Sequence, residues 1–259
     1  MDGTTQMIDQ FALSRVTVFV GAFGSGKTEL ALNFAIRLAD AGSAAGSASG
    51  DCAGDCAPRA VLADIDILKP MFRSRELGAQ LTARGVRVVS GAPDYEMADV
   101  PALSPAIYGA IEDKSVPLVM DVGGDDDGAR ALGRFRWHLE RAGYDMLYVM
   151  NTLRPFSSEP EEIITMLRAV ENASRLSCTA LVSNTNLGAA STAEEARAGL
   201  GIVRRVSGMV GIPVRFFTVS RGVAQSSHES VRRISLDSGI PAFVIDRLVL
   251  PPWERPCEE

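Results

Sequence analysis

Short apolar segments alternate with amphipathic segments along most of this chain. The apolar segments are strand-sized and often β-branched, as strands covered on both faces are. We expect strands at residues 15–20, 60–65, 86–90, 116–121, 145–150, 178–183, 213–219 and 242–246. The alternation predicts an α/β fold: a mostly parallel, twisted sheet of about seven to eight strands with helices on both faces, forming three layers.

The segments between these strands carry apolar residues at helical spacing. Two of them follow acidic runs, at residues 125–127 and 159–162, which is typical of a helix N-terminus. The four apolar stripes are Leu30, Phe34 and Leu38; Leu132, Phe135, Leu139 and Ala142; Ile163, Leu167 and Val170; and Ala196, Leu200, Val203 and Val206. Each stripe predicts a helix that packs on the sheet.

One segment interrupts the alternation. Residues 41–58 read AGSAAGSASGDCAGDCAP, a run of small residues that predicts a flexible surface insertion. We interpret it as an insertion within a single domain that spans residues 1–259. Cys52 and Cys56 lie in it; they are either ligands of a metal or iron–sulfur cluster or ordinary loop thiols, and the isolated pair favours the second interpretation.

Composition narrows the class of protein. Apolar residues make up 46% of the 259 residues and charged residues 22%, which is typical of a soluble globular protein. No apolar run reaches the ~18–20 residues of a membrane span, and Met1–Gln10 does not resemble a secretory signal. Four cysteines without such a signal indicate a cytoplasmic protein with reduced thiols. The formal charge of −6 argues against nucleic acid as the main partner.

The strongest motif is the run GAFGSGKT at Gly21–Thr28, which matches G-x-x-x-x-G-K-[ST] between a predicted strand and a predicted helix. Its glycines let successive backbone N–H groups face a phosphate, while Lys27 reaches the β- and γ-phosphates and the Thr28 hydroxyl binds Mg²⁺. A glycine-rich turn that binds nothing is the weaker alternative. We expect nucleotide contacts from Gly21, Gly24, Ser25, Gly26, Lys27, Thr28 and Glu29.

A second candidate lies at the end of the predicted strand 116–121. Asp121 ends this strand, where a carboxylate lies beside the phosphate loop and can hold Mg²⁺. Gly123 and Gly124 follow, and either can bring a backbone N–H to the γ-phosphate and sense whether it is present. The alternative is a helix-capping aspartate followed by a glycine turn.

A third candidate is the pair Asp64 and Asp66. We expect Asp66, the outer residue, to contact the metal and to orient the water that attacks the γ-phosphate, and we expect Asp64 to face away. Arg73 and Arg75 follow in a charged stretch, as phosphate or partner contacts or as surface ion pairs with Glu76.

The fourth candidate is Asn184, at the end of the predicted strand 178–183. A side-chain amide offers both donors and acceptors to a base edge. Capping of the turn that follows the strand is the alternative.

These segments, in this order, resemble the SIMIBI class of P-loop NTPases, which includes MinD, ParA, CobQ and CobB. The resemblance covers roughly residues 15–220 and implies that Asp66 activates water and that Asn184 touches the base. Guanine-specific relatives carry N-K-x-D where this chain has Asn184 to Leu187, so the resemblance implies adenine. Ala22 stands where MinD and ParA carry their signature lysine, which argues against their mode of dimerisation. The run Asn151–Phe156 resembles other ATP-binding proteins of the superfamily, which implies a loop near the nucleotide.

The sequence therefore predicts a cytoplasmic, Mg²⁺-dependent ATP-binding protein, a slow ATPase that acts as a switch on a protein partner or as a homodimer. One alternative is an ATP-dependent ligase or kinase-like enzyme that resembles dethiobiotin synthetase or CobB. The others are an iron–sulfur carrier gated by nucleotide and an ATP sensor without turnover.

Overall fold

The computed structural model describes residue 11 and residues 13–45, 57–65, 75–90, 105–124, 126–155 and 157–249. All eight predicted strands are present. They are β1 (Val16–Val20), β2 (Ala60–Asp64), β3 (Val86–Ser90), β4 (Leu118–Asp121), β5 (Tyr144–Met150), β6 (Ala180–Ser183), β7 (Val214–Ser220) and β8 (Ala242–Ile245). They form one sheet in the order β3-β2-β4-β1-β5-β6-β7-β8. Every neighbouring pair is parallel, which confirms the predicted sheet.

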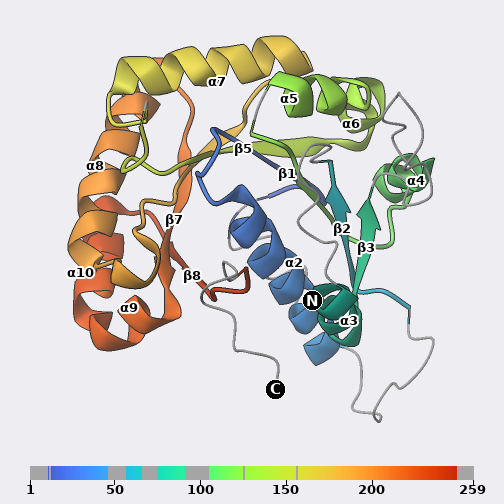
Figure 1. Cartoon of the computed structure of the whole chain (residues 1–259), viewed down its shortest axis with the longest axis horizontal. Coiled ribbons are helices and arrows are strands. Elements are labelled where there is room, and N and C mark those ends of the chain that lie inside the picture. The colour runs from blue at the N-terminus through green and yellow to red at the C-terminus, as the bar shows by residue number, and fades with distance from the viewer. Residues whose placement is uncertain are drawn as a thin grey trace.

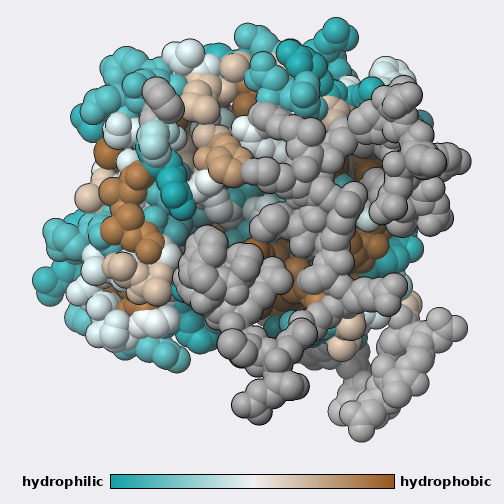
Figure 2. Space-filling model, viewed as in Figure 1, coloured by the Kyte–Doolittle hydropathy of each residue, from teal (hydrophilic) through white to brown (hydrophobic). Residues whose placement is uncertain are grey.

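Helices cover both faces of the sheet (Figure 1). They are α2 (Lys27–Ala45), α3 (Arg75–Ala83), α4 (Pro105–Glu112), α5 (Asp126–Gly133), α6 (Arg136–Ala142), α7 (Pro160–Ser174), α8 (Ala193–Val210), α9 (Arg221–Ser226) and α10 (His228–Ser238). Their outer surface is largely hydrophilic where Figure 2 shows it, as expected for amphipathic helices.

The core has two main layers, one on each side of the sheet. On one side, Phe34 and Leu38 of α2 pack against inward residues such as Leu62 and Val119. On the other side, α4 to α8 pack against the alternate strand residues, among them Met120. A third cluster joins α8, α9 and α10 to β7. The sheet is therefore buried on both faces, as its apolar strands predicted.

Two helix boundaries differ from the predicted ones. The stripe from Leu132 to Ala142 is divided, because α5 ends at Gly133 and α6 begins at Arg136, with buried Phe135 between them. A Cβ on Gly133 would lie 3.0 Å from the Ser174 carbonyl oxygen, so the glycine allows α5 to end close against α7. Helix α2 continues to Ala45, into the predicted insertion, since alanine favours helix. Residues 46–56, with Cys52 and Cys56, lie outside the described residues.

The parallel arrangement decides which loops can meet. Strand β1 lies between β4 and β5, so the loops that follow these two strands flank the loop that follows β1. The carboxyl ends of parallel strands all open on one edge of the sheet, which is where ligands bind in such folds.

Candidate functional site

The motif Gly21–Thr28 forms a tight loop between β1 and α2, which we call the phosphate loop. Gly21 and Gly26 both have positive φ, +146° and +84°. A Cβ on Gly21 would lie 2.3 Å from the Val149 carbonyl oxygen of β5, and one on Gly26 would lie 2.3 Å from Asn184 Nδ2. Only glycine satisfies both the backbone angle and the close approach at these positions. The loop shape therefore depends on the glycines that the motif specifies.

Polar groups inside this loop are arranged to meet an anion. Lys27 is the first residue of α2, its side chain is buried, and its Nζ donates to the Ala22 carbonyl oxygen at 3.0 Å. The Ser25 hydroxyl is buried and has no hydrogen-bond partner among the described residues. Thr28 and Glu29 complete the first turn of α2, whose backbone N–H groups have no acceptor within the helix. Such a helix start binds phosphate well.

The loop after β4 contacts the phosphate loop directly. A Cβ on Gly124 would lie 2.8 Å from the backbone nitrogen of Phe23 and 2.9 Å from Lys27 Nζ. The contact is so close that no larger side chain fits without moving the phosphate loop. The structure thus brings the segment of Gly123 and Gly124 to the lysine side of the loop.

Two buried aspartates lie side by side on neighbouring strands. Asp64 of β2 and Asp121 of β4 are register partners, with 4% and 2% of their surface exposed. Leu62 and Val119, two residues earlier in each strand, belong to the core layer of α2. Since residues two apart in a strand share a face, both aspartates project towards the side where α2 begins.

The expectation that Asp64 faces away from the phosphate loop is therefore wrong. Asp64 is on the same face as Asp121, and the two carboxylates are oxygen donors of the kind that Mg²⁺ prefers. Asp66 and Arg73 lie outside the described residues, and Arg75 begins α3 without a described side chain. The role of Asp66 stays a prediction.

Side-chain amides and hydroxyls form the other side of the site. Asn184 is buried; its Nδ2 donates to the Ser25 carbonyl oxygen at 2.7 Å, and its Oδ1 accepts from the Thr218 hydroxyl. These bonds attach the end of β6 to the phosphate loop and to β7. In this structure Asn184 positions the loop, and contact with a base remains a prediction.

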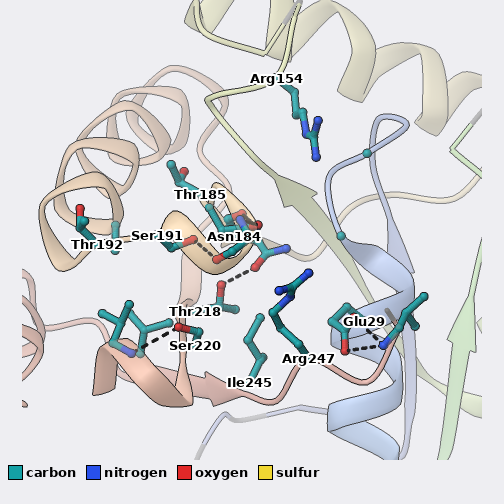
Figure 3. A pocket seen from close by; sticks show the side chains of 18 residues that line it. Glu29, Arg154, Asn184, Thr185, Ser191, Thr192, Thr218, Ser220, Ile245 and Arg247 are labelled. Atoms are coloured by element: carbon teal, nitrogen blue, oxygen red, sulfur yellow. Dashed lines mark hydrogen bonds between the residues drawn. The ribbon is translucent and has the colours of Figure 1, made fainter. Parts of the chain in front are cut away.

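A cavity of about 240 Å³ opens next to this network, on the side of β5 to β8 (Figure 3). Its lining includes Gly24 and Gly26 from the phosphate loop, so the cavity is continuous with the phosphate site. Arg154 lies in the run Asn151–Phe156, which was predicted as a loop near the nucleotide, although Arg154 itself was not singled out. The lining residues that were not predicted at all are Ser191, Thr192, Thr218, Ser220 and Arg247. Position after the carboxyl end of a strand was a usable signal for Arg154 and Arg247.

Glu29 connects the phosphate loop to the C-terminal part of the chain. Its carboxylate lines the cavity and accepts the backbone N–H groups of Leu248 and Val249, the latter at 3.1 Å. Burial raises the pKa of Glu29, and these two hydrogen bonds partly oppose that increase. One turn further along α2, Asn33 exchanges two hydrogen bonds with the backbone of Asp246. The segment after β8 is thereby held as one wall of the cavity.

The arrangement fits a nucleotide with a magnesium ion. Lys27 and the Ser25 hydroxyl are buried in the loop that leads into α2, and the buried Asp64 and Asp121 are register partners on neighbouring strands. No group of three or more His, Cys, Asp or Glu side chains in the described ranges could hold a metal unaided. Mg²⁺ commonly takes only one or two carboxylates and completes its shell with water and phosphate oxygens.

Among the helices that the structure describes, none combines the length and the apolar character that a membrane span requires.

Comparison with known proteins gives structural matches only. No protein-family profile and no curated protein sequence matches the chain. The solved structures that are similar include the cell division protein FtsY from Thermotoga maritima, with 18% identity and a TM-score of 0.49. They also include the signal recognition particle receptor FtsY from Elizabethkingia anophelis in complex with GDP, with 16% identity and a TM-score of 0.46. The matches cover 79% and 80% of this chain but only 61% and 57% of those two proteins.

Proposed function

We propose that this protein binds Mg²⁺–ATP, hydrolyses it slowly and acts as a nucleotide-driven switch. The observation that carries the proposal is the phosphate loop itself. Three of its glycines have positive φ, Lys27 is buried within it, and the Ser25 hydroxyl has no other use among the described residues. A loop built only for folding would not require a buried lysine and an unsatisfied hydroxyl, since both carry a desolvation cost.

The proposed reaction is attack of water on the γ-phosphate. Lys27 and the N–H groups of the loop stabilise the negative charge, and Asp66 orients the water. Thr28 and Asp121 hold the magnesium ion, with Asp66 as a further contact; the ion neutralises phosphate charge when it is bound. Loss of the γ-phosphate is sensed at Gly123 or Gly124, of which Gly124 adjoins the loop at Phe23.

The composition of the cavity supports adenine as the base. Guanine readers present a carboxylate to the base N–H groups, and Glu29 is the one carboxylate among the described lining residues. Its oxygens already accept from the backbone of Leu248 and Val249. The remaining lining groups are amides, hydroxyls, arginines and apolar side chains, which suit a base without an acidic partner.

The experiment is a titration of the protein with a fluorescent ATP analogue in the presence of Mg²⁺, together with a phosphate-release assay. We expect Lys27→Ala to lose useful affinity, because a hydrogen bond to a charged group in a site with little water contributes about 1.5–3 kcal/mol. Asp66→Ala should keep ATP binding and lose about 10²-fold or more in turnover. Unchanged affinity in Lys27→Ala would mean that the motif only shapes the loop.

Two further measurements test the choice of base and the alternative of a ligase. GTP that competes about tenfold better than ATP, a difference of about 1.4 kcal/mol, would overturn the choice of adenine. Phosphate release that appears only when a small carboxylic acid is added would identify an ATP-dependent ligase instead of a switch.

A further inference from the structure

Arg154 lies on the opposite side of the phosphate loop from Gly124. It belongs to the short loop after β5, the strand that flanks β1 on that side. A Cβ built on Gly24 would lie 3.5 Å from Arg154 Nε and 3.8 Å from Arg154 Cζ. Figure 3 shows the guanidinium extending from this loop towards the phosphate loop and the cavity. The tip of the phosphate loop is therefore bordered by a glycine on one side and by a guanidinium on the other.

The loop that carries Arg154 is held in place by hydrogen bonds. Asn151 Nδ2 donates to the Asn186 carbonyl oxygen at 3.0 Å, and Asn151 Oδ1 accepts the backbone N–H of Asn186 at 3.3 Å and that of Leu153 at 3.2 Å. The hydroxyls of Thr152 and Thr185 lie 3.0 Å apart. The Arg154 backbone N–H donates to the Asn151 carbonyl oxygen, which closes the turn. The backbone at Arg154 is thus held in place by hydrogen bonds to a segment that lines the cavity.

The charge of Arg154 has no counterpart in the described part of the chain. Arginines on the outer helices, such as Arg130, Arg136 and Arg168, pair with carboxylates. Arg154 forms no such pair and no side-chain hydrogen bond with a described residue, although it is exposed and adjoins a phosphate loop. An uncompensated guanidinium beside Gly24, on the loop that also holds buried Lys27, makes this edge of the sheet strongly attractive to a polyanion.

We infer that Arg154 binds the α- and β-phosphates of the nucleotide, within the same chain; this inference rests on the proposed function. The carboxylates and Gly124 lie on the β4 side of the loop, where the γ-phosphate and the metal are expected. Arg154 lies on the β5 side and lines the cavity that suits the base and ribose. Its planar fork can contact two phosphate oxygens together, which a lysine cannot do.

The test measures ATP and ADP affinities separately, with fluorescent analogues of each and with Mg²⁺. Arg154→Ala should weaken both by a similar factor of about tenfold or more, because ATP and ADP share the α- and β-phosphates. Arg154→Lys should recover part of the loss through its charge alone. Arg205→Ala, at an exposed arginine of α8, is the matched control and should bind like the wild type. The melting temperature without nucleotide should be the same for all of these proteins.

Three outcomes would contradict the inference. If Arg154→Ala binds both nucleotides within about twofold of the wild type while Lys27→Ala does not bind, Arg154 is a bystander and the proposed function stands. If Arg154→Ala loses ATP but keeps ADP, the arginine contacts the γ-phosphate and the assignment to the α- and β-phosphates is wrong. If the wild type binds neither nucleotide, the proposed function and this inference fail together.

Discussion

The two sides of the phosphate loop are built from different chemistry. On the β4 side, the buried groups are ionisable: Asp64 and Asp121 are register partners, and Lys27 lies in the phosphate loop. On the β5 and β6 side, the buried groups are neutral amides and hydroxyls that bond to one another, with Asn184 at their centre. The first side is suited to binding cations and phosphate, and the second is suited to holding the loop in shape.

This difference has an energetic basis. A satisfied network of neutral hydrogen bonds is stable in a low dielectric and needs no ligand. Buried carboxylates in a low dielectric are stabilised by a nearby cation, so the groups on the β4 side can gain from a bound metal ion. We therefore expect substitutions on the β4 side to act mainly on nucleotide binding and those on the β6 side to act mainly on folding.

Gly124→Ala is expected to have a large effect on nucleotide affinity. The new methyl group would lie within 3.0 Å of the Phe23 backbone and of Lys27 Nζ, so the tip of the phosphate loop must move. Nucleotide affinity should fall by about a hundredfold, because several charge-assisted contacts of about 1.5–3 kcal/mol each are misplaced together. Titration with a fluorescent ATP analogue measures this loss, and thermal unfolding without nucleotide should change little.

Gly109→Ala is the matched control for that substitution. Gly109 lies in α4, and a Cβ there would meet nothing within 4 Å. Alanine in a helix interior is about 1 kcal/mol more favourable than glycine, so this variant should be slightly more stable and bind nucleotide normally. If Gly124→Ala also binds nucleotide normally, the loop after β4 can shift to accommodate the methyl group, and it is not a sensor of the γ-phosphate.

Asn184→Ala is expected to lower the stability of the fold. The substitution removes the donor to the Ser25 carbonyl oxygen and the acceptor for the Thr218 hydroxyl, and it leaves both groups buried. A buried polar group without a partner costs about 1–3 kcal/mol, so the free energy of unfolding should fall by about 2–4 kcal/mol. Chemical denaturation at neutral pH measures it. Asn172→Ala, at an exposed asparagine of α7, should leave stability within about 0.5 kcal/mol.

The sequence predicted the frame of the molecule and the proximity of two of the candidate segments. The eight strands follow from short apolar runs, because a parallel sheet buried on both faces leaves that pattern in every strand. The motif Gly21–Thr28 and the contact of Gly124 with its loop follow from local spacing and strand ends. Residues of β7, of β8 and of the segments that follow β1, β5 and β6 meet at the cavity, and Thr218 of β7 carries no local signal of its bond to Asn184. Only the order of the strands in the sheet brings such residues together.

Two other outcomes have simpler physical reasons. Asp64 lies on the face of Asp121 because the two are register partners on neighbouring parallel strands, and partners in register share a face of the sheet. Glu29 was expected to contact the nucleotide. In the structure its carboxylate accepts hydrogen bonds from the backbone of Leu248 and Val249, which lie more than two hundred residues later in the chain. A contact of that separation leaves no pattern in the sequence of either segment.

The smallest expected effect tests that last contact. Burial raises the pKa of Glu29 above its ordinary value of 4.5, so folding disfavours the charged form. The stabilising contribution of protonated Glu29 is therefore fully present below pH 4.5 and is lost as the pH rises through the raised pKa of the folded protein. Glu29→Gln removes this titration, and the amide oxygen still accepts one of the two N–H groups. Relative to the variant, the wild type should thus be more stable at pH 4 than at pH 7, by less than the effect of Asn184→Ala. Urea unfolding of both proteins at the two pH values measures this double difference, in which the titration of all other groups cancels. A wild type that gains on the variant as the pH rises would show that the hydrogen bonds to Leu248 and Val249 outweigh burial, and that Glu29 holds the cavity wall as a carboxylate.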